Sequence, residues 1–385
     1  MASDTRTKRQ KLHRRFYTVM RALFSPLIRH MYAFRPAPAQ KIEGPFLLLA
    51  NHVTAADPVL IGVSMPQQMY FVASEHLMQK GLLSKLLRFF LDPIVRRKGD
   101  TAVTAVKEML RCLKGGRSVC LFPEGTCSYD GTNPPMLPTV AKVAKTAGCS
   151  LVTYRFEGGY FTLPRWGRGI RKGSFTGGVV HVYTPEQLKT MRDAELFAAI
   201  EADLCENAYA RIEASPAAYK SRHRAEYLES AFFLCPVCRR VGTVQTRGDT
   251  LRCSCGMRGR LDEQYRLSGL PVKTLIEWDA LENDWLKKAA DEPAFSFSDG
   301  PVTLSVNDDA HRHSAVASGT LTETAQTLSV GDTSFALSDI TDMELVRRNL
   351  LVFSTDEGHY QISGSPSFNA RKYMLLYRIR KGVRI

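Results

Sequence analysis

The fold of the first part of this chain is decided by residues 51–58, Asn-His-Val-Thr-Ala-Ala-Asp-Pro. They follow a short apolar run, residues 46–49, which predicts a buried strand. Asp57 directly before Pro58 predicts the start of a helix, because Asp is a favoured N-cap residue and Pro suits the first helical position. His52 is therefore expected on the turn between a strand and a helix, with Asp57 at the beginning of that helix.

This arrangement allows acid–base chemistry. A carboxylate five residues after a histidine, across a tight turn, can accept a hydrogen bond from the Nδ1–H of His52. That bond would fix the tautomer and leave Nε2 as a general base. The alternative is that the spacing arises by chance, since Asp57 as an N-cap needs no catalytic explanation.

A second stretch of sequence predicts another loop at the end of a buried strand. Residues 118–122, Ser-Val-Cys-Leu-Phe, predict another short buried strand, and Pro-Glu-Gly-Thr at 123–126 leaves its end. Two such strand ends would converge on one edge of an open α/β sheet, where sheets of this class bind ligands.

The two motifs in this order, His-x4-Asp and then Phe-Pro-Glu-Gly-Thr, resemble those of the glycerophospholipid acyltransferase family. That family includes the 1-acylglycerol-3-phosphate O-acyltransferases, and the resemblance covers about residues 40–215. It implies that His52 and Asp57 are catalytic and that the substrate is bound by Asn51, Thr54, Glu124, Gly125 and Thr126.

A third patch, Ile-Val-Arg-Arg at 94–97, resembles the family motif that binds the substrate phosphate. The resemblance assigns this role to Arg97, whose planar guanidinium suits a phosphate; a solvated basic turn is the alternative. The chain departs from the family where an Arg usually follows Glu-Gly-Thr, since Cys127 stands there. It also lacks the proline expected after the strand at 151–155. The missing charge could come from Arg155, Arg165 or Arg168.

The resemblance implies acyl transfer from acyl-CoA or acyl carrier protein to the hydroxyl of a lysophospholipid. The expected acceptor is 1-acylglycerol 3-phosphate, giving phosphatidic acid, and no catalytic cofactor is required because a thioester is already electrophilic. Glycerol 3-phosphate or a lyso-aminolipid remain alternative acceptors. The rival hypothesis is a zinc-ribbon protein that binds lipid or nucleic acid and carries an inactive acyltransferase domain.

The net positive charge of the chain indicates that it binds an anionic partner. The chain has 385 residues, enough for two or three domains, and a formal net charge of +14. Such an excess suits nucleic acid or an anionic membrane face. The basic residues concentrate at the N-terminus and around 165–172, so we expect the membrane surface rather than nucleic acid.

The N-terminal segment, residues 1–40, is predicted to associate with that membrane. It lacks a secretory signal and an uninterrupted transmembrane run. Apolar residues recur near helical spacing after a cationic run: Phe16, Met20, Leu23, Leu27 and Met31. This pattern predicts an interfacial amphipathic helix and a peripheral or monotopic protein on the cytoplasmic face of the cell membrane. The alternative is a helix packed on the protein's own core.

Residues 41–215 alternate between strand-like and helix-like patches, which predicts an α/β layer fold. The expected helices include 76–91, 101–113, 139–146 and one long helix from Pro185 to about Ile212. The expected strands include 69–73, 94–95, 150–156 and 178–183.

Four of the nine cysteines are clustered in a small segment, residues 230–262. Their knuckle-like spacing suits a tetrahedral zinc site formed by Cys235, Cys238, Cys253 and Cys255. The second pair is Cys-x-Cys, which is less usual, and redox-active or free thiols are the alternative. No neighbouring His or Glu indicates an open position, so the zinc is expected to be structural. The alternative partner of this segment is nucleic acid, because it carries Arg239, Arg240, Arg247, Arg252, Arg258 and Arg260.

The rest of the chain predicts a linker helix in residues 270–292 and a β-rich domain in residues 293–385. Short alternating runs lie at 302–306, 319–322, 327–330, 334–337, 350–354 and 359–362. A helix opened by Ser365-Pro366 closes the domain. About seven strands and one C-terminal helix resemble a pleckstrin-homology-like domain, although a fold alone does not establish a function.

Overall fold

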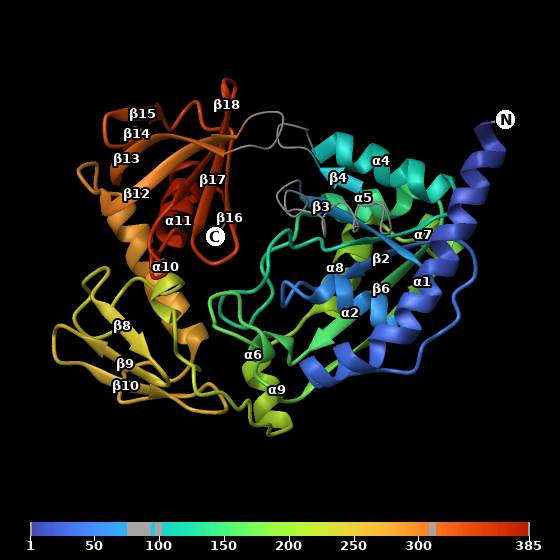
Figure 1. The fold of residues 1–385 in the computed structure, drawn as a ribbon, viewed down its shortest axis with the longest axis horizontal. Helices are drawn as coiled ribbons and strands as arrows, with labels where there is room; N and C mark the ends of the chain where they lie inside the picture. Colours follow the sequence, from blue (N-terminus) through green and yellow to red (C-terminus); the bar gives the residue numbers. More distant parts are fainter. Residues whose placement is uncertain (1, 75–93, 97–101, 308–312, 384–385) are drawn as a thin grey trace. The chain divides into compact units, whose positions relative to one another are not determined.

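The computed structural model describes residues 2–74, 94–96, 102–307 and 313–383. It divides into two compact units, each described by itself below (Figure 1). The first contains residues 1–164 and 170–219, and the second contains 165–169 and 220–385. The predicted helix at 76–91 and the predicted phosphate ligand Arg97 lie outside the described residues.

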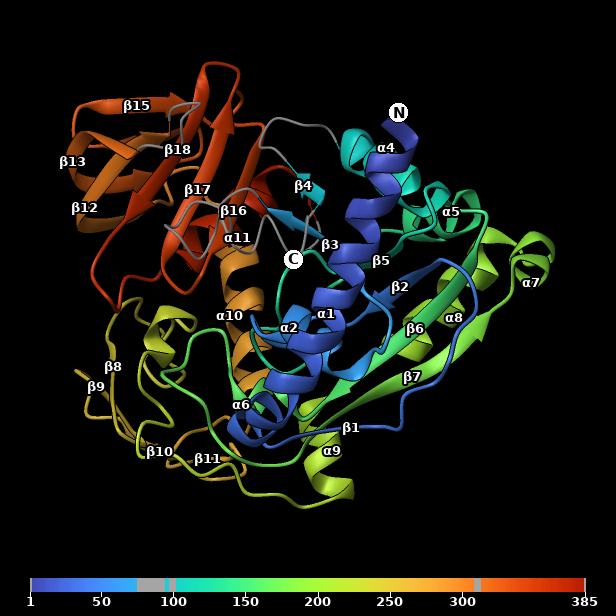
Figure 2. The same cartoon turned by 45° about the vertical axis from the view of Figure 1, so that its right-hand side comes forward.

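The first unit is built on a seven-stranded sheet with the order β1-β7-β6-β2-β5-β3-β4 (Figure 2). β2 pairs in parallel with β5 and β6, whereas β7 runs antiparallel to β6. The strands are β1 (Phe34–Pro36), β2 (Phe46–Ala50), β3 (Met69–Ser74), β4 (Ile94–Arg96), β5 (Ser118–Leu121), β6 (Ser150–Glu157) and β7 (Phe175–Tyr183). The predicted α/β layer fold is confirmed.

The helices of this unit are α1 (Ala2–Tyr32), α2 (Asp57–Ser64), α4 (Ala102–Lys114), α5 (Thr139–Thr146), α6 (Gly159–Thr162), α7 (Pro185–Thr190), α8 (Asp193–Leu204) and α9 (Ala208–Ala214). The prediction of one long helix from Pro185 to Ile212 is wrong, because three helices occupy that range. Local capping explains the breaks. The Glu195 carboxylate accepts the N–H of Arg192 before α8, and the Asn207 side chain accepts two N–H groups at the start of α9.

Side chains of β2 alternate between two apolar layers. Phe46, Leu48 and Ala50 pack with α1 and α2. Leu47 and Leu49 pack on the opposite face with α4, α5 and α8. All five residues are fully buried, as expected for a central strand covered by helices on both sides. This burial fixes the position of the loop that follows β2.

Helix α1 has two different faces. The Tyr17 hydroxyl shares its hydrogen between the carbonyl oxygens of Gly62 and Met65, each 2.9 Å away, so one face is held against α2. On another face Val19, Leu23 and Leu27 are 62%, 66% and 60% exposed. The helix therefore packs on its own unit and still presents apolar side chains outward. Among the described residues, no helix combines the length and apolar character needed to cross a membrane.

The second unit begins with the cysteine-rich segment. Its antiparallel sheet has the order β11-β10-β9-β8, formed by β8 (Val244–Arg247), β9 (Thr250–Cys253), β10 (Arg258–Leu261) and β11 (Leu267–Ser268). A 3-10 turn, η2 (Leu228–Ser230), precedes it, and the helix α10 (Leu275–Ala290) follows. Trp278 and Glu282 of α10 hydrogen-bond the backbone of Leu234, beside Cys235, so α10 supports the cysteine segment.

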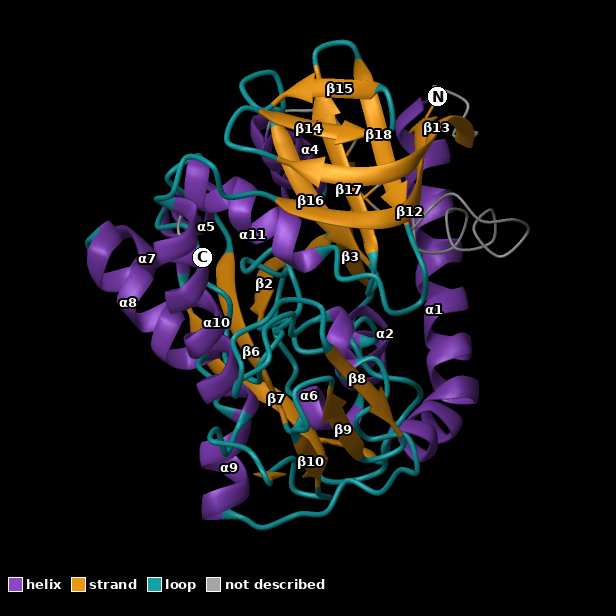
Figure 3. Ribbon diagram, turned by 90° about the vertical axis from the view of Figure 1, so that its left-hand side faces the viewer, coloured by secondary structure: helices purple, strands orange, loops and turns teal. Residues whose placement is uncertain are grey.

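A second seven-stranded sheet completes this unit, with the antiparallel order β15-β14-β13-β12-β18-β17-β16 (Figure 3). Its strands are β12 (Phe297–Asn307), β13 (His313–Glu323), β14 (Thr327–Val330), β15 (Thr333–Ala336), β16 (Asp342–Val346), β17 (Leu350–Thr355) and β18 (Gly358–Ser363). The C-terminal helix α11 (Arg371–Arg380) begins later than the predicted start at Ser365. A largely β domain ending in a helix is thus confirmed.

Candidate active site

The two sequence motifs meet where β2 and β5 end. Because these neighbouring strands are parallel, the residues that follow them emerge at the same edge of the sheet. The Glu124 Oε2 atom, after β5, accepts a hydrogen bond of 3.0 Å from the backbone N–H of His52, after β2. The predicted convergence of the two motifs is therefore present in the structure.

The predicted contact between the acid and the imidazole is also present. Asp57 Oδ2 lies 2.8 Å from Nδ1 of His52. The Asp57 carboxylate is fully buried and also accepts the N–H groups of Val53 and Thr54, at 2.7 and 3.0 Å, and the hydroxyl of Thr54, at 2.7 Å. A buried carboxylate with this many donors is held firmly in place. It orients the imidazole so that Nδ1 carries the proton and Nε2 is left as the basic nitrogen.

Asp57 is not the N-cap of the following helix, contrary to the prediction from Asp-Pro. Helix α2 starts at Asp57, its N-cap is Ala56, and Pro58 lies in the first turn. The carboxylate instead turns back and hydrogen-bonds the loop of residues 52–54. Asp57 therefore stabilises the turn that carries His52 rather than the end of its own helix.

Glu124 points inward toward the backbone. Its second oxygen, Oε1, accepts a hydrogen bond of 2.5 Å from Asn133 Nδ2. Asn133 also bonds the carbonyl of Leu204 and the N–H of Glu206, which connects this loop to the end of α8. Burial raises the pKa of Glu124 to about 7, although the hydrogen bonds from Asn133 and His52 oppose this effect. The carboxylate holds the backbone of His52 in position.

Of the other residues assigned from the motifs, two are fully buried and two are at least partly exposed. Asn51 is fully buried, and its side chain bonds the N–H and carbonyl of Phe156, which ties β2 to β6. Thr54 is also fully buried and bonds Asp57. Gly125 is exposed, and its φ of +70° lies in the left-handed region that favours glycine. Thr126 is partly exposed beside it.

Cys127 lies against the imidazole, a contact that no motif in the sequence predicts. Its sulfur is 3.4 Å from His52 Nε2 and 3.6 Å from Nδ1. Phe122 stacks on the same ring, with 4.4 Å between the ring centroids. Burial lowers the pKa of His52, but Cys127 and Asp57 beside the ring outweigh it and raise that pKa well above its usual value.

The three arginines considered as replacements for the missing family Arg are bound to acceptors of the protein. Arg155 donates to Glu157 and to the carbonyl of Asp203. Arg165 and Arg168 belong to the second unit, where Arg165 bonds the carbonyls of Leu345 and Arg347, and Arg168 pairs with Glu226. Each of these three guanidinium groups is thus engaged by acceptors within its own unit.

Comparison with known families agrees with this geometry. Residues 28–157 match the model of the family described as Acyltransferase, a range that contains both motifs. Residues 28–157 of the first unit therefore carry an acyltransferase domain.

Two solved structures are similar to parts of the chain. One is the 1-acyl-sn-glycerophosphate acyltransferase PlsC from Thermotoga maritima, at 21% identity and a TM-score of 0.43, covering 50% of this chain and 78% of that one. The other is the N-terminal PH domain of human ARAP2, at 10% identity and a TM-score of 0.19, covering 23% of this chain and 80% of that one.

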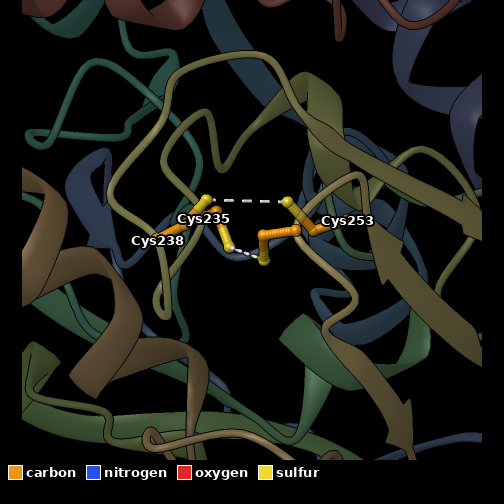
Figure 4. Close-up of side chains that lie close together, drawn as sticks. Cys235, Cys238 and Cys253 are labelled. Atoms are coloured by element: carbon orange, nitrogen blue, oxygen red, sulfur yellow. Dashed lines mark hydrogen bonds between the residues drawn. The ribbon is translucent and has the colours of Figure 1, made fainter.

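The second unit contains a separate cluster of four sulfur atoms, those of Cys235, Cys238, Cys253 and Cys255. All four lie within 4.8 Å of one another. The sulfur of Cys238 is 3.8 Å from that of Cys253, and the sulfurs of Cys235 and Cys255 are 3.9 Å apart (Figure 4). Thiolates bound tetrahedrally at about 2.3 Å from zinc lie about 3.8 Å from one another. The cluster therefore fits a four-coordinate metal.

Proposed function

We propose that this protein transfers an acyl group from acyl-CoA or acyl carrier protein to the hydroxyl of a lysophospholipid. The observation that carries the proposal is the hydrogen bond between His52 and the buried Asp57, beside Glu124, inside the matched acyltransferase domain. The proposed acceptor is 1-acylglycerol 3-phosphate, which would yield phosphatidic acid for phospholipid synthesis.

The reaction requires a base, because a neutral alcohol is a weak nucleophile. Nε2 of His52 removes the hydroxyl proton as the oxygen attacks the carbonyl carbon of the thioester. The carbon–sulfur bond then breaks, and His52 returns the proton to the departing thiolate. Asp57 keeps the ring in the required orientation and stabilises the imidazolium that forms between these steps. The His52 side chain is 18% exposed, whereas Asp57 is fully buried, so only the imidazole can meet the substrate.

Arg97 is the proposed partner of the acceptor's phosphate, and Gly125 and Thr126 would line the acceptor site. The assignment of the acceptor can be tested with a panel consisting of 1-acylglycerol 3-phosphate, glycerol 3-phosphate and lyso-aminolipids. Each is incubated with acyl-CoA or acyl carrier protein, and the lipids formed are identified by mass spectrometry. Product from the first acceptor alone supports the proposal. If His52→Ala forms product as fast as the wild type, the mechanism is wrong.

The proposed partner surface for α1 is an anionic membrane. Val19, Leu23 and Leu27 are spaced four residues apart, so their exposed side chains form one apolar stripe. Arg15 and Arg29 are exposed on the same helix and would face anionic headgroups. Lysophospholipid and product both reside in membranes, and this helix would hold the acyltransferase domain at their surface.

The metal proposed for the cysteine cluster is zinc. Cys235, Cys238, Cys253 and Cys255 would supply all four ligands, which leaves no open position for chemistry. When bound, zinc would stabilise the small sheet of β8 to β11. The acyl transfer described above does not involve it.

A further inference from the structure

Glu124 has a partner, Asn133, to which the proposed mechanism assigns no role. The Oε1 atom of Glu124 accepts the Nδ2–H of Asn133 at 2.5 Å, and its Oε2 atom accepts the backbone N–H of His52 at 3.0 Å. Glu124 is 8% exposed, and among the described residues no Lys or Arg forms an ion pair with it. A buried carboxylate without a cation depends on its N–H donors, so the loss of either donor leaves it poorly compensated.

The side-chain amide of Asn133 has one orientation that satisfies its neighbours. Its Nδ2 also donates to the carbonyl of Leu204 at 3.1 Å, while its Oδ1 accepts the N–H of Glu206 at 2.5 Å. A reversed amide would place its oxygen against two acceptors and its NH2 group against a donor. Three hydrogen bonds therefore direct the N–H of Asn133 at Glu124.

The contacts of Glu206 lead back to the strand that carries the proposed base. Its carboxylate, 5% exposed, accepts the N–H of Gly158 at 3.0 Å and binds Arg211 through both oxygens, at 2.7 and 2.6 Å. Gly158 follows β6, where the backbone of Phe156 exchanges two hydrogen bonds with the side chain of Asn51, the residue before the base. Hydrogen bonds and short stretches of chain thus form a closed network, which runs in this order: His52, Glu124, Asn133, Glu206, Gly158, Phe156 and Asn51.

We propose that Asn133 is a positioning residue for acyl transfer, because it closes the network that holds the backbone of His52 in place. The inference rests on the proposed function, in which Nε2 of His52 must meet the acceptor hydroxyl. Asp57 orients the imidazole, but it belongs to the same turn and would move with it. The network joins that turn to β6 and to the end of α8, so it determines where the imidazole lies. A displacement of about 1 Å can cost about 100-fold in rate.

The inference is tested first by steady-state kinetics of full-length Asn133→Ala with both substrates varied. Its kcat should fall by about 10- to 100-fold while both KM values stay within about twofold, because the base is displaced and no substrate contact is removed. A second measurement requires no turnover. Diethyl pyrocarbonate, which modifies neutral imidazoles, should label His52 faster in the variant than in the wild type, as measured by peptide mapping.

Asn207→Ala is the matched control. Asn207 lies outside the network, and its side chain accepts two N–H groups at the start of α9. Its replacement should lower the melting temperature, because the helix loses its cap. At temperatures where the control is folded, its kcat and the labelling rate of His52 should equal those of the wild type.

Asn133→Asp separates positioning from general packing. This variant keeps an acceptor for the N–H of Glu206 but places a second carboxylate against Glu124. Two such carboxylates share one proton at low pH and repel each other when both are ionised. The other titratable groups that act on Glu124, namely His52 and Asp57, are the same in both proteins. The ratio of variant to wild-type turnover should therefore rise as pH falls, whereas a loss of packing alone would leave it constant.

The outcomes distinguish this inference from the proposed function. Wild-type kcat in Asn133→Ala, or a turnover ratio for Asn133→Asp that does not change with pH, would overturn the role of Asn133 and leave acyl transfer by His52 intact. Should Asn133→Ala fail to fold, the ratio measured with Asn133→Asp decides. If the wild-type protein makes no acylated lipid at all, the proposed function itself fails.

Discussion

The Oδ2 atom of Asp57 lies 2.8 Å from Nδ1 of His52 and accepts the backbone N–H groups of Val53 and Thr54 as well. One buried oxygen thus sets both the orientation of the imidazole and the shape of the turn that presents it. The side chain of Asp57 cannot reach the substrate, because it is fully buried. In the proposed mechanism His52 is therefore the catalytic residue and Asp57 the positioning residue, and the two roles predict different responses to mutation.

His52→Ala should reduce acyl transfer by about 10² to 10⁴-fold, because the variant lacks the general base. Its thermal stability should change little, since the ring is partly exposed and its backbone contacts remain. Asp57→Asn should also reduce turnover. It replaces the charged hydrogen-bond acceptor of several N–H groups by a neutral one, so it should lower the melting temperature as well. Turnover and thermal unfolding measured on both variants distinguish the roles; a strongly destabilised His52→Ala would show that its ring is chiefly structural.

Acyl transfer should depend on pH through His52. Asp57 and Cys127 raise the pKa of the imidazole well above its usual 6.5, despite the opposing effect of burial. Only the neutral ring can accept a proton from the acceptor hydroxyl, so kcat/KM for the acceptor should rise with pH and level off above this raised pKa. In Asp57→Asn the inflection should move to lower pH, because the imidazolium loses its carboxylate partner. An inflection that stays in place would exclude Asp57 as the cause.

The pKa of Glu124 predicts a second pH dependence, this time of stability. Burial raises the pKa of Glu124 from 4.5 to about 7, so between these values the folded protein binds more protons than the unfolded chain. Its stability should therefore fall as pH rises through this window, by about 3 kcal/mol in total from this residue. Urea unfolding measured from pH 4.5 to 7.5 checks the slope. The stability of Glu124→Gln should depend less on pH over the same range, because the amide keeps the shape of the side chain but does not titrate.

Much of the site could be predicted because its motifs are local. Residues 51–58 place His52 and Asp57 five residues apart on one turn, and strand periodicity placed Glu124 at the end of a neighbouring strand. The role of Asp57 in its turn was not predictable, since an Asp before Pro resembles an N-cap in sequence. Asn133 and the sulfur of Cys127 reach the site through the path of a loop, which has no periodicity to interpret. The breaks in the predicted long helix depend on single capping residues such as Asn207.

The apolar stripe of α1 predicts binding to anionic vesicles. Replacing both Leu23 and Leu27 by Glu should weaken vesicle binding by roughly 100-fold, because two exposed leucines no longer enter the membrane and two negative charges are added. Thr18→Glu is the control, since Thr18 is exposed on the same helix away from the stripe. Vesicle co-sedimentation measures the difference. If the double variant and the control bind equally well, the stripe has another partner.

The cysteine cluster predicts a metal content that can be measured without any assay of acyl transfer. Metal analysis of purified protein should find about one zinc per chain, and Cys253→Ser should lose it. Cys253 ends β9, and Cys235 lies beside Leu234, which α10 holds through Trp278 and Glu282. Loss of the metal should therefore make the 230–262 segment sensitive to proteolysis, because the ion would join the loop before β8 to the end of β9. Cys205→Ser should retain both zinc and resistance, whereas a zinc-free wild-type protein with a resistant segment would show that the four thiols pack without an ion.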